Sequence, residues 1–165
     1  MANTFHVAVY VSSIPEAVEQ YRKFLGIEPA KVHHDYAKFE LQDPPVIFSL
    51  NVGGEAGTLS HLGIRYPSTG DVASEMVRVK QSDVPLLQQQ GTTCCYAKAD
   101  KFWVKDNDGI PWEMYTVLED VAAETAADAQ LRNFLGQQTA GLVEADPTPG
   151  SGCCVPQKLT QIAER

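Results

Sequence analysis

An internal repeat constrains the fold of this chain more than any other feature of its sequence. Phe5-His6-Val7 matches Ser60-His61-Leu62 at an offset of 55 residues, and Ser13 and Ser68, which precede the expected helices, match at the same offset. Each copy has the hydrophobic pattern of a strand, a helix and three further strands. The sequence therefore predicts two similar βαβββ modules within one α+β domain.

The expected elements follow from apolar periodicity and from turn residues. Alternating valines predict the first strand, and apolar residues at helical spacing predict the helix after it. Gly26 is expected to end that helix, and Ser68 or Asp71 to cap the second one. The predicted strands are 4–11, 29–34, 36–41, 45–51, 59–66, 84–89, 101–106 and 111–117, and the predicted helices are 14–25 and 70–80.

The composition changes near residue 118, after which Phe134 is the only aromatic residue. We expect residues 1–118 to form the two-module domain, with module one at 4–51 and module two at 59–117. Two such modules usually pair into one curved, cup-shaped mixed sheet, with helices outside and a site inside the cup. For 119–165 we expect a helix followed by a flexible tail that carries a cysteine pair.

Length, charge and hydropathy argue against several classes of function. A chain of 165 residues fits one domain with a core that needs no disulfides. Its net charge of −8 disfavours binding to nucleic acids or to anionic membrane surfaces. No apolar run is long enough to span a membrane, and His6 interrupts the opening apolar stretch, which predicts a strand rather than a signal peptide. The expected location is the cytoplasm, and the oligomeric state stays open.

Three residues are candidate metal ligands. His6 and His61 occupy equivalent positions on the first strands of the two modules, and Glu113 lies in the last strand, IPWEMYTV. Two imidazoles and a carboxylate form the facial triad of non-haem Fe(II) oxygenases, which leaves positions open on the metal. A single histidine on a strand is most often a packed or surface residue, but the symmetry of the pair favours a metal site. The adjacent His33 and His34 are expected to be a solvent-exposed pair instead.

This repeat, with its candidate ligands at matching positions, resembles the vicinal-oxygen-chelate superfamily of glyoxalases, bleomycin-resistance proteins and extradiol dioxygenases. The resemblance covers about residues 4–117. A glyoxalase I of this superfamily typically has four protein ligands, two from each module. Here the repeat matches Glu113 with Phe48, so we expect a three-ligand site, which suits oxygen activation better than isomerisation. Glu55 as a fourth ligand is the minor alternative.

All four cysteines occur in adjacent pairs, Cys94-Cys95 and Cys153-Cys154. A disulfide between sequence neighbours would be strained, so we expect free dithiols. The repeat offset rises from 55 to 65 after the second helix, which places Cys94-Cys95 in an insertion of ten residues. Adjacent thiolates can chelate trivalent arsenic, antimony or Cd²⁺, and the alternative is a pair of small buried hydrophobes. Cys153-Cys154 is either a metalloid shuttle or part of an unused tail.

The segment GTTCCYAKADKFWVKDNDGIPWEMYTVLED closely resembles organoarsenical carbon–arsenic lyases, also known as cadmium-induced proteins. The shared motifs include the cysteine pair, the D-K-x-W-V strand, the D-x-D-G turn, the W-E-x-Y strand and the tail motif GCCVP at 152–156. The resemblance implies a dioxygenase that uses Fe(II) and dioxygen to cleave trivalent organoarsenicals such as methylarsonous acid, and aromatic arsenicals in some members, releasing arsenite. The three candidate metal ligands would hold Fe(II), and Cys94 and Cys95 would hold arsenic.

The ten-residue insertion that carries Cys94-Cys95 also predicts a mobile loop. The loop at 84–99 is expected to be an open lid without arsenical and to close when arsenic binds both thiols. The alternative is a rigid loop with its thiols already at the cup wall. Lys98 and Lys101 are expected to favour the thiolate form.

Two other classes of function remain open. One is a stress protein that sequesters cadmium or metalloid without turnover. The other is a glyoxalase-type metalloenzyme or a thiol transferase, for which the sequence offers no basic cluster arranged for glutathione carboxylates. The preference between alkyl and aryl arsenicals stays open as well.

Overall fold

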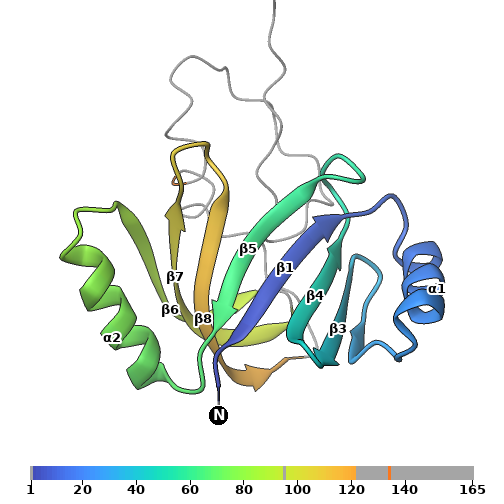
Figure 1. The fold of residues 1–165 in the computed structure, drawn as a ribbon, viewed down its shortest axis with the longest axis horizontal. Helices are drawn as coiled ribbons and strands as arrows, with labels where there is room; N and C mark the ends of the chain where they lie inside the picture. The colour runs from blue at the N-terminus through green and yellow to red at the C-terminus, as the bar shows by residue number, and fades with distance from the viewer. Residues whose placement is uncertain (1, 95, 122–133, 135–165) are drawn as a thin grey trace, which may run out of the picture.

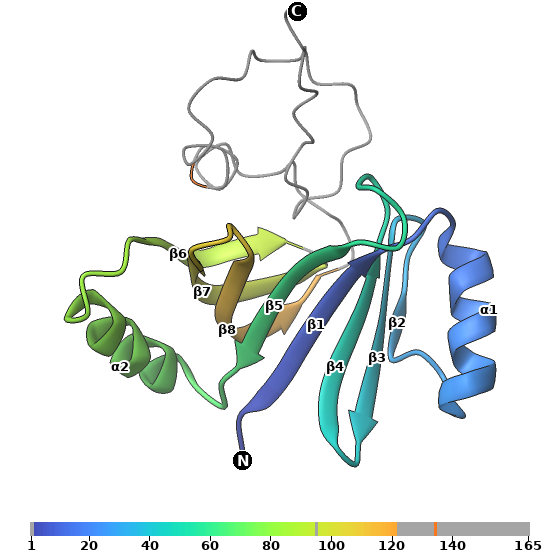
Figure 2. The same ribbon diagram turned by 45° about the horizontal axis from the view of Figure 1, so that its top comes forward.

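The computed structural model describes residues 2–94, 96–121 and 134. It confirms an α+β fold in which one curved eight-stranded mixed sheet is flanked by two helices (Figures 1 and 2). The strands are β1 (Thr4–Tyr10), β2 (Lys31–Val32), β3 (Tyr36–Gln42), β4 (Pro45–Asn51), β5 (Leu59–Arg65), β6 (Leu86–Cys94), β7 (Ala97–Lys105) and β8 (Pro111–Asp120), and the helices are α1 (Ile14–Leu25) and α2 (Thr69–Lys80).

The two modules meet at the centre of the sheet. The strand order is β2-β3-β4-β1-β5-β8-β7-β6, so each module contributes four neighbouring strands. The first strands of the modules, β1 and β5, pair antiparallel, and each pairs parallel with the last strand of its own module. The repeated sequence therefore produces a pseudo-two-fold arrangement about the β1–β5 junction.

The helices begin and end where side-chain chemistry predicts. Ser13 accepts a hydrogen bond from the Glu16 amide at the start of α1, and Gly26 ends the helix with a φ of 70°. Ser68 caps α2 by accepting from the Asp71 amide. Each helix packs on the outer face of its own module, and no helix among the described residues is long and apolar enough to cross a membrane.

The prediction of a loop at 84–99 is wrong for most of that segment. β6 and β7 form a long hairpin in which Thr92 pairs with Ala99 and Cys94 with Ala97. The insertion lengthens both strands, so its backbone groups bond to each other instead of facing solvent. The strand β8 also continues to Asp120, so the helix expected from residue 119 does not begin there. Most of the predicted tail, with Cys153 and Cys154, lies outside the described residues.

Candidate metal centre

The structure brings the three predicted ligands together at the centre of the sheet. His6 is on β1, His61 on β5 and Glu113 on β8, which are neighbouring strands. Gly63 pairs with both His6 and Glu113, so it separates them in the sheet. A Cβ atom at residue 63 would lie 2.6 Å from the Glu113 carbonyl oxygen, so a glycine permits this close approach.

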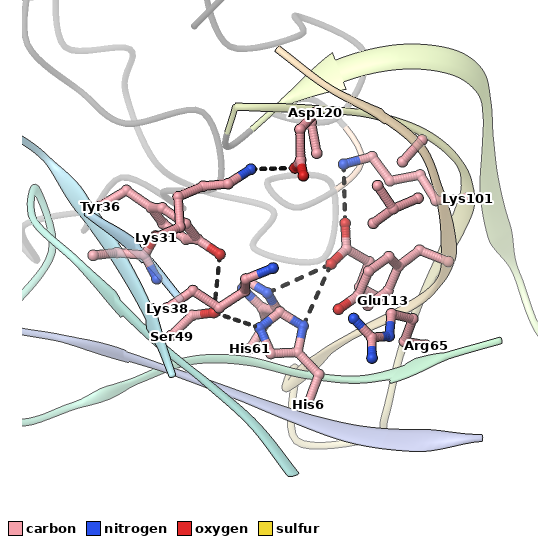
Figure 3. Close-up of a pocket in the computed structure, with 15 residues that line it drawn as sticks. His6, Lys31, Tyr36, Lys38, Ser49, His61, Arg65, Lys101, Glu113 and Asp120 are labelled. Atoms are coloured by element: carbon pink, nitrogen blue, oxygen red, sulfur yellow. Dashed lines mark hydrogen bonds and ion pairs between the residues drawn. The ribbon is translucent and has the colours of Figure 1, made fainter. Parts of the chain in front are cut away.

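The ligand atoms converge on one point inside the cup (Figure 3). Glu113 Oε2 lies 3.7 Å from His6 Nδ1 and 3.7 Å from His61 Nε2, and all three residues are buried. These two imidazole nitrogens are buried without a hydrogen-bond partner among the described residues. Because orphaned buried polar atoms are rare and costly, the arrangement fits a metal ion held by two nitrogens and one oxygen.

Serine hydroxyls orient both imidazoles. His6 Nε2 lies 3.0 Å from Ser49 Oγ, and His61 Nδ1 lies 3.1 Å from Ser60 Oγ. When these nitrogens donate their protons to the serines, the opposite nitrogens turn lone pairs toward Glu113, as metal binding requires. Tyr36 extends the contact between His6 and Ser49, because its hydroxyl lies 3.2 Å from Ser49 Oγ.

The position in module one that corresponds to Glu113 is Ser49 and not Phe48. Ala8 pairs with Ser49 just as Gly63 pairs with Glu113. Tyr36 pairs with Asn51, 15 positions later, whereas Lys101 pairs with Tyr115, 14 positions later, so the repeat offset falls from 65 to 64 before Glu113. A one-residue shift moves a side chain to the opposite face of a strand. Phe48 accordingly packs outside the cup, with its ring centroid 4.8 Å from that of Tyr21.

Lys101 has a role that the sequence did not indicate. Its Nζ donates to Glu113 Oε1 at 2.9 Å, and its side chain is buried. The sequence predicted instead that this lysine favours the thiolate form of the cysteines. The contact leaves Glu113 Oε2 facing the two imidazoles. By the strand pairing, Tyr36 is the counterpart of Lys101 in module one, so the Lys101–Glu113 pair corresponds to the Tyr36–Ser49 pair.

The electrostatics keep all three ligands in their metal-binding forms. Burial lowers the pKa of His6 to about 3, with a further contribution from His61, and burial lowers the pKa of His61 to about 4. Burial alone would raise the pKa of Glu113, but Lys101 and the two imidazoles bring it below the usual value. At neutral pH the site therefore consists of two neutral imidazoles and one carboxylate, which needs no deprotonation before it binds a metal.

These pKa values predict how the stability of the metal-free protein depends on pH. Both histidines titrate near 6.5 when unfolded and well below that when folded, so the unfolded chain binds more protons as pH falls. We expect the free energy of unfolding to be highest above about pH 6.5 and to fall by about 1.4 kcal/mol per pH unit for each histidine at lower pH.

Urea unfolding of chelator-treated protein at several pH values measures this slope. The double variant with His6→Gln and His61→Gln is the control, and its slope should be smaller. Equal slopes in the two proteins would contradict the inferred pKa values.

The remaining predicted site residues are only partly placed. The backbone of Cys94 ends β6, whereas Cys95, Cys153 and Cys154 lie outside the described residues. Glu55 is exposed in the connection between β4 and β5 and does not line the cup, so the structure gives no support to it as a fourth ligand.

The prediction of an exposed histidine pair holds for His34 but not for His33. The side chain of His34 is 85% exposed. The ring of His33 is half-buried and stacks on that of Tyr96, with ring centroids 3.4 Å apart.

The cup also carries basic residues that were not evident as a cluster in the sequence. Lys31, Lys38 and Arg65 line it from three different strands. Lys38 and Arg65 both form ion pairs with Glu40, at 2.8 and 3.2 Å, and Lys31 pairs with Asp120. Because these residues gather only when β2, β3 and β5 face the same cavity, their spacing in the chain did not reveal them.

Several known proteins are similar to this chain in sequence. Residues 4–114 match the family model of the Glyoxalase/Bleomycin resistance protein/Dioxygenase superfamily. A trivalent organoarsenical cleaving enzyme of Bacillus sp. (strain MD1) is 39% identical over 113 residues, which are 67% of this chain and 70% of that protein. The cadmium-induced protein CadI of Mycobacterium tuberculosis (strain ATCC 25618 / H37Rv) is 38% identical over 115 residues, 69% of this chain and 76% of that protein.

Among solved structures, an extradiol ring-cleaving dioxygenase from B. fuscum superposes with a TM-score of 0.55. The match covers 70% of this chain and 32% of that one, with 15% sequence identity. At this identity the likeness concerns the fold alone.

Proposed function

Because the chain belongs to the glyoxalase, bleomycin-resistance and dioxygenase superfamily, we propose that it is an Fe(II)-dependent dioxygenase that cleaves the carbon–arsenic bond of trivalent organoarsenicals and releases arsenite. The observation that carries the proposal is the convergence of His6, His61 and Glu113, with Ser49 at the place where a fourth ligand would stand. Three protein ligands leave room on the metal for dioxygen and substrate. The names of the organoarsenical cleaving relatives support this substrate class.

The chain's own residues have separate tasks in this proposal. Bound Fe(II) would supply the activation of dioxygen. Ser49 and Ser60 hold the imidazoles in their metal-binding orientation, and Lys101 fixes the carboxylate of Glu113. Cys94 and Cys95 bind the arsenic centre, which holds the organic group beside the metal and raises its effective concentration there.

Arsenic speciation after aerobic incubation tests this function. The protein is loaded with Fe(II) without oxygen, mixed with methylarsonous acid and then exposed to air. We expect arsenite to appear only when Fe(II), dioxygen and protein are all present. Tight binding of the arsenical without arsenite release would overturn the proposal and favour sequestration.

Sequestration of cadmium is the second candidate function, because a cadmium-induced relative is 38% identical and this chain carries an adjacent cysteine pair. Two thiolates suit Cd²⁺ as well as arsenic. Under this alternative, Cd²⁺ would bind tightly through the thiols and no organoarsenical would be converted.

The cysteine pairs allow a matched test within one chain. Cys94→Ser or Cys95→Ser should reduce the affinity for a trivalent arsenical by at least about 100-fold, because one thiolate cannot chelate, and should leave Fe(II) binding intact. Cys153→Ser and Cys154→Ser are the controls, and most activity should remain if the tail only shuttles metalloid. Full activity in both of the first two variants would contradict the proposed role of the thiols.

A further inference from the structure

One wall of the cup carries basic side chains that have no task in the metal centre. Lys31, Lys38 and Arg65 line the cavity that also holds His6 and His61 (Figure 3). We call these three basic residues the basic wall. The chain as a whole has a net charge of −8, so its overall composition does not explain a cluster of cations in the cup. The basic wall indicates that this part of the cup attracts negative charge.

The two lysines of the basic wall face each other directly. β2 and β3 pair so that Lys31 lies opposite Lys38, and both residues line the cup. Like charges directly opposite each other on neighbouring strands destabilise a sheet. Such a pair beside a cavity indicates a ligand whose negative charge offsets the repulsion.

The carboxylates near the basic wall neutralise only part of its charge. Lys31 forms an ion pair with Asp120. Lys38 and Arg65 share one oxygen, Oε1 of Glu40, at 2.8 and 3.2 Å. The three cations therefore meet two carboxylates. A lysine ammonium has three N–H donors and an arginine guanidinium has five, so both partners of Glu40 have further donors for a ligand.

An amide group near the basic wall is buried without a partner. Asn51 lines the cup and is 8% exposed, and its Nδ2 has no hydrogen-bond partner among the described residues. Because an unsatisfied buried donor is costly, this group indicates a missing acceptor. Lys38 lies opposite Ser49, and Asn51 is two positions further along β4 on the same face. Diagonal neighbours of this kind are about 7–8 Å apart, so one ligand group can contact both side chains.

The basic wall adjoins the metal centre. Ser49, which lies opposite Lys38, contacts His6 Nε2 at 3.0 Å. Neighbouring strands are about 4.8 Å apart, so Lys38 begins one strand away from this contact. The space within the cup, including the part open to solvent, is about 590 Å³. A cavity of this size accommodates an aromatic ring with a substituent.

We propose that the basic wall and Asn51 form a subsite for an acidic oxygen group, such as a carboxylate, on the organic part of the substrate. This inference rests on the proposed function, because it takes the substrate to be an organoarsenical. Lys38, Arg65 and Asn51 donate hydrogen bonds to the acidic group, and Lys31 adds positive potential. A methyl group has nothing to offer these donors. The subsite therefore favours aromatic arsenicals that carry an acidic substituent over alkyl arsenicals.

Anaerobic binding of two matched arsenicals to Fe(II)-loaded protein tests the subsite, because no dioxygen is present to allow turnover. Phenylarsonous acid and its 4-carboxy derivative differ only in the carboxylate. The wild type should bind the carboxylated compound roughly 10- to 100-fold more tightly, as charge-assisted hydrogen bonds predict. Lys38→Gln and Asn51→Leu should each bring the ratio of the two affinities closer to one, whereas Lys38→Arg keeps the charge and should retain most of the preference.

Lys23→Gln is the matched control, because Lys23 is an exposed lysine on α1 that is also paired with a glutamate. It should keep the wild-type ratio of affinities. A ratio near one in the wild type would overturn the inference. A wild-type ratio in either Lys38→Gln or Asn51→Leu would overturn it as well.

Benzoate provides a second measurement that involves no arsenic. Calorimetry on metal-free protein compares benzoate with benzamide, a neutral compound of similar shape. Benzoate should bind at least about 5-fold more tightly, and this difference should shrink in Lys38→Gln and at high salt. Equal binding of the two compounds would contradict the subsite. If the wild type bound neither arsenical, the proposed function would fail instead, and benzoate alone would then decide whether the subsite exists.

Discussion

Replacing Glu113 by alanine should weaken Fe(II) binding by at least about 100-fold and abolish arsenite release. Glu113 supplies the only carboxylate of the centre among the described residues, and its Oε2 atom lies 3.7 Å from each unpartnered imidazole nitrogen. Its loss also leaves Lys101 buried without the carboxylate that neutralises it. The retained iron is measured after chelator washing, together with arsenic speciation.

Glu119→Ala is the matched control, because Glu119 is an exposed glutamate on the same strand, β8. It should retain iron and activity. Equal iron content in Glu113→Ala and the wild type would contradict the assignment of the centre. A thermal unfolding scan of each protein distinguishes loss of the ligand from loss of the fold.

Ser49→Glu should produce the second large effect, a fall in turnover of about 100-fold together with tighter metal binding. Ser49 occupies the position in module one that corresponds to Glu113, so a glutamate there would reach the metal as a fourth protein ligand. It would occupy a position that the proposed reaction needs for dioxygen or substrate. Metal affinity and steady-state arsenite release are both measured.

Ser49→Ala separates this blocking effect from loss of the contact with His6. It removes the hydrogen bond to Nε2 but adds no ligand, so we expect about 10-fold weaker iron binding and a site that still turns over. If Ser49→Glu retained the wild-type rate, an open fourth position would not be required. That result would remove the argument for oxygen activation from the three-ligand site.

The repeat explains why much of the fold could be predicted. Val7 and Val9 on β1 and the apolar spacing of α1 are local patterns, and Ser13, Gly26 and Ser68 mark helix ends by local hydrogen bonding. The hairpin of β6 and β7 could not be predicted in this way. Its extra residues have no counterpart in module one, and only pairing across the turn shows that they are strand.

The candidate site likewise contains residues that could be predicted from the sequence and residues that could not. His6 and His61 were predictable because the repeat equates their strands, and Glu113 because only a few side chains of its strand could supply a ligand. Ser49 was missed because the repeat offset changes by one residue between the last two strands of a module, and a one-residue shift changes which face a side chain occupies. The contact of Lys101 with Glu113 was missed because it depends on the pairing of β7 with β8.

The coupling of dioxygen uptake to arsenite release tests the central claim most directly. Methylarsonous acid and one molecule of dioxygen balance to formaldehyde and arsenous acid, with no added reductant. Fe(II)-loaded protein should therefore consume one dioxygen for each arsenite released, and it should release none without oxygen. Arsenite release in the absence of dioxygen, or dioxygen uptake with no arsenite, would contradict the assignment of the protein as a carbon–arsenic bond cleaving dioxygenase.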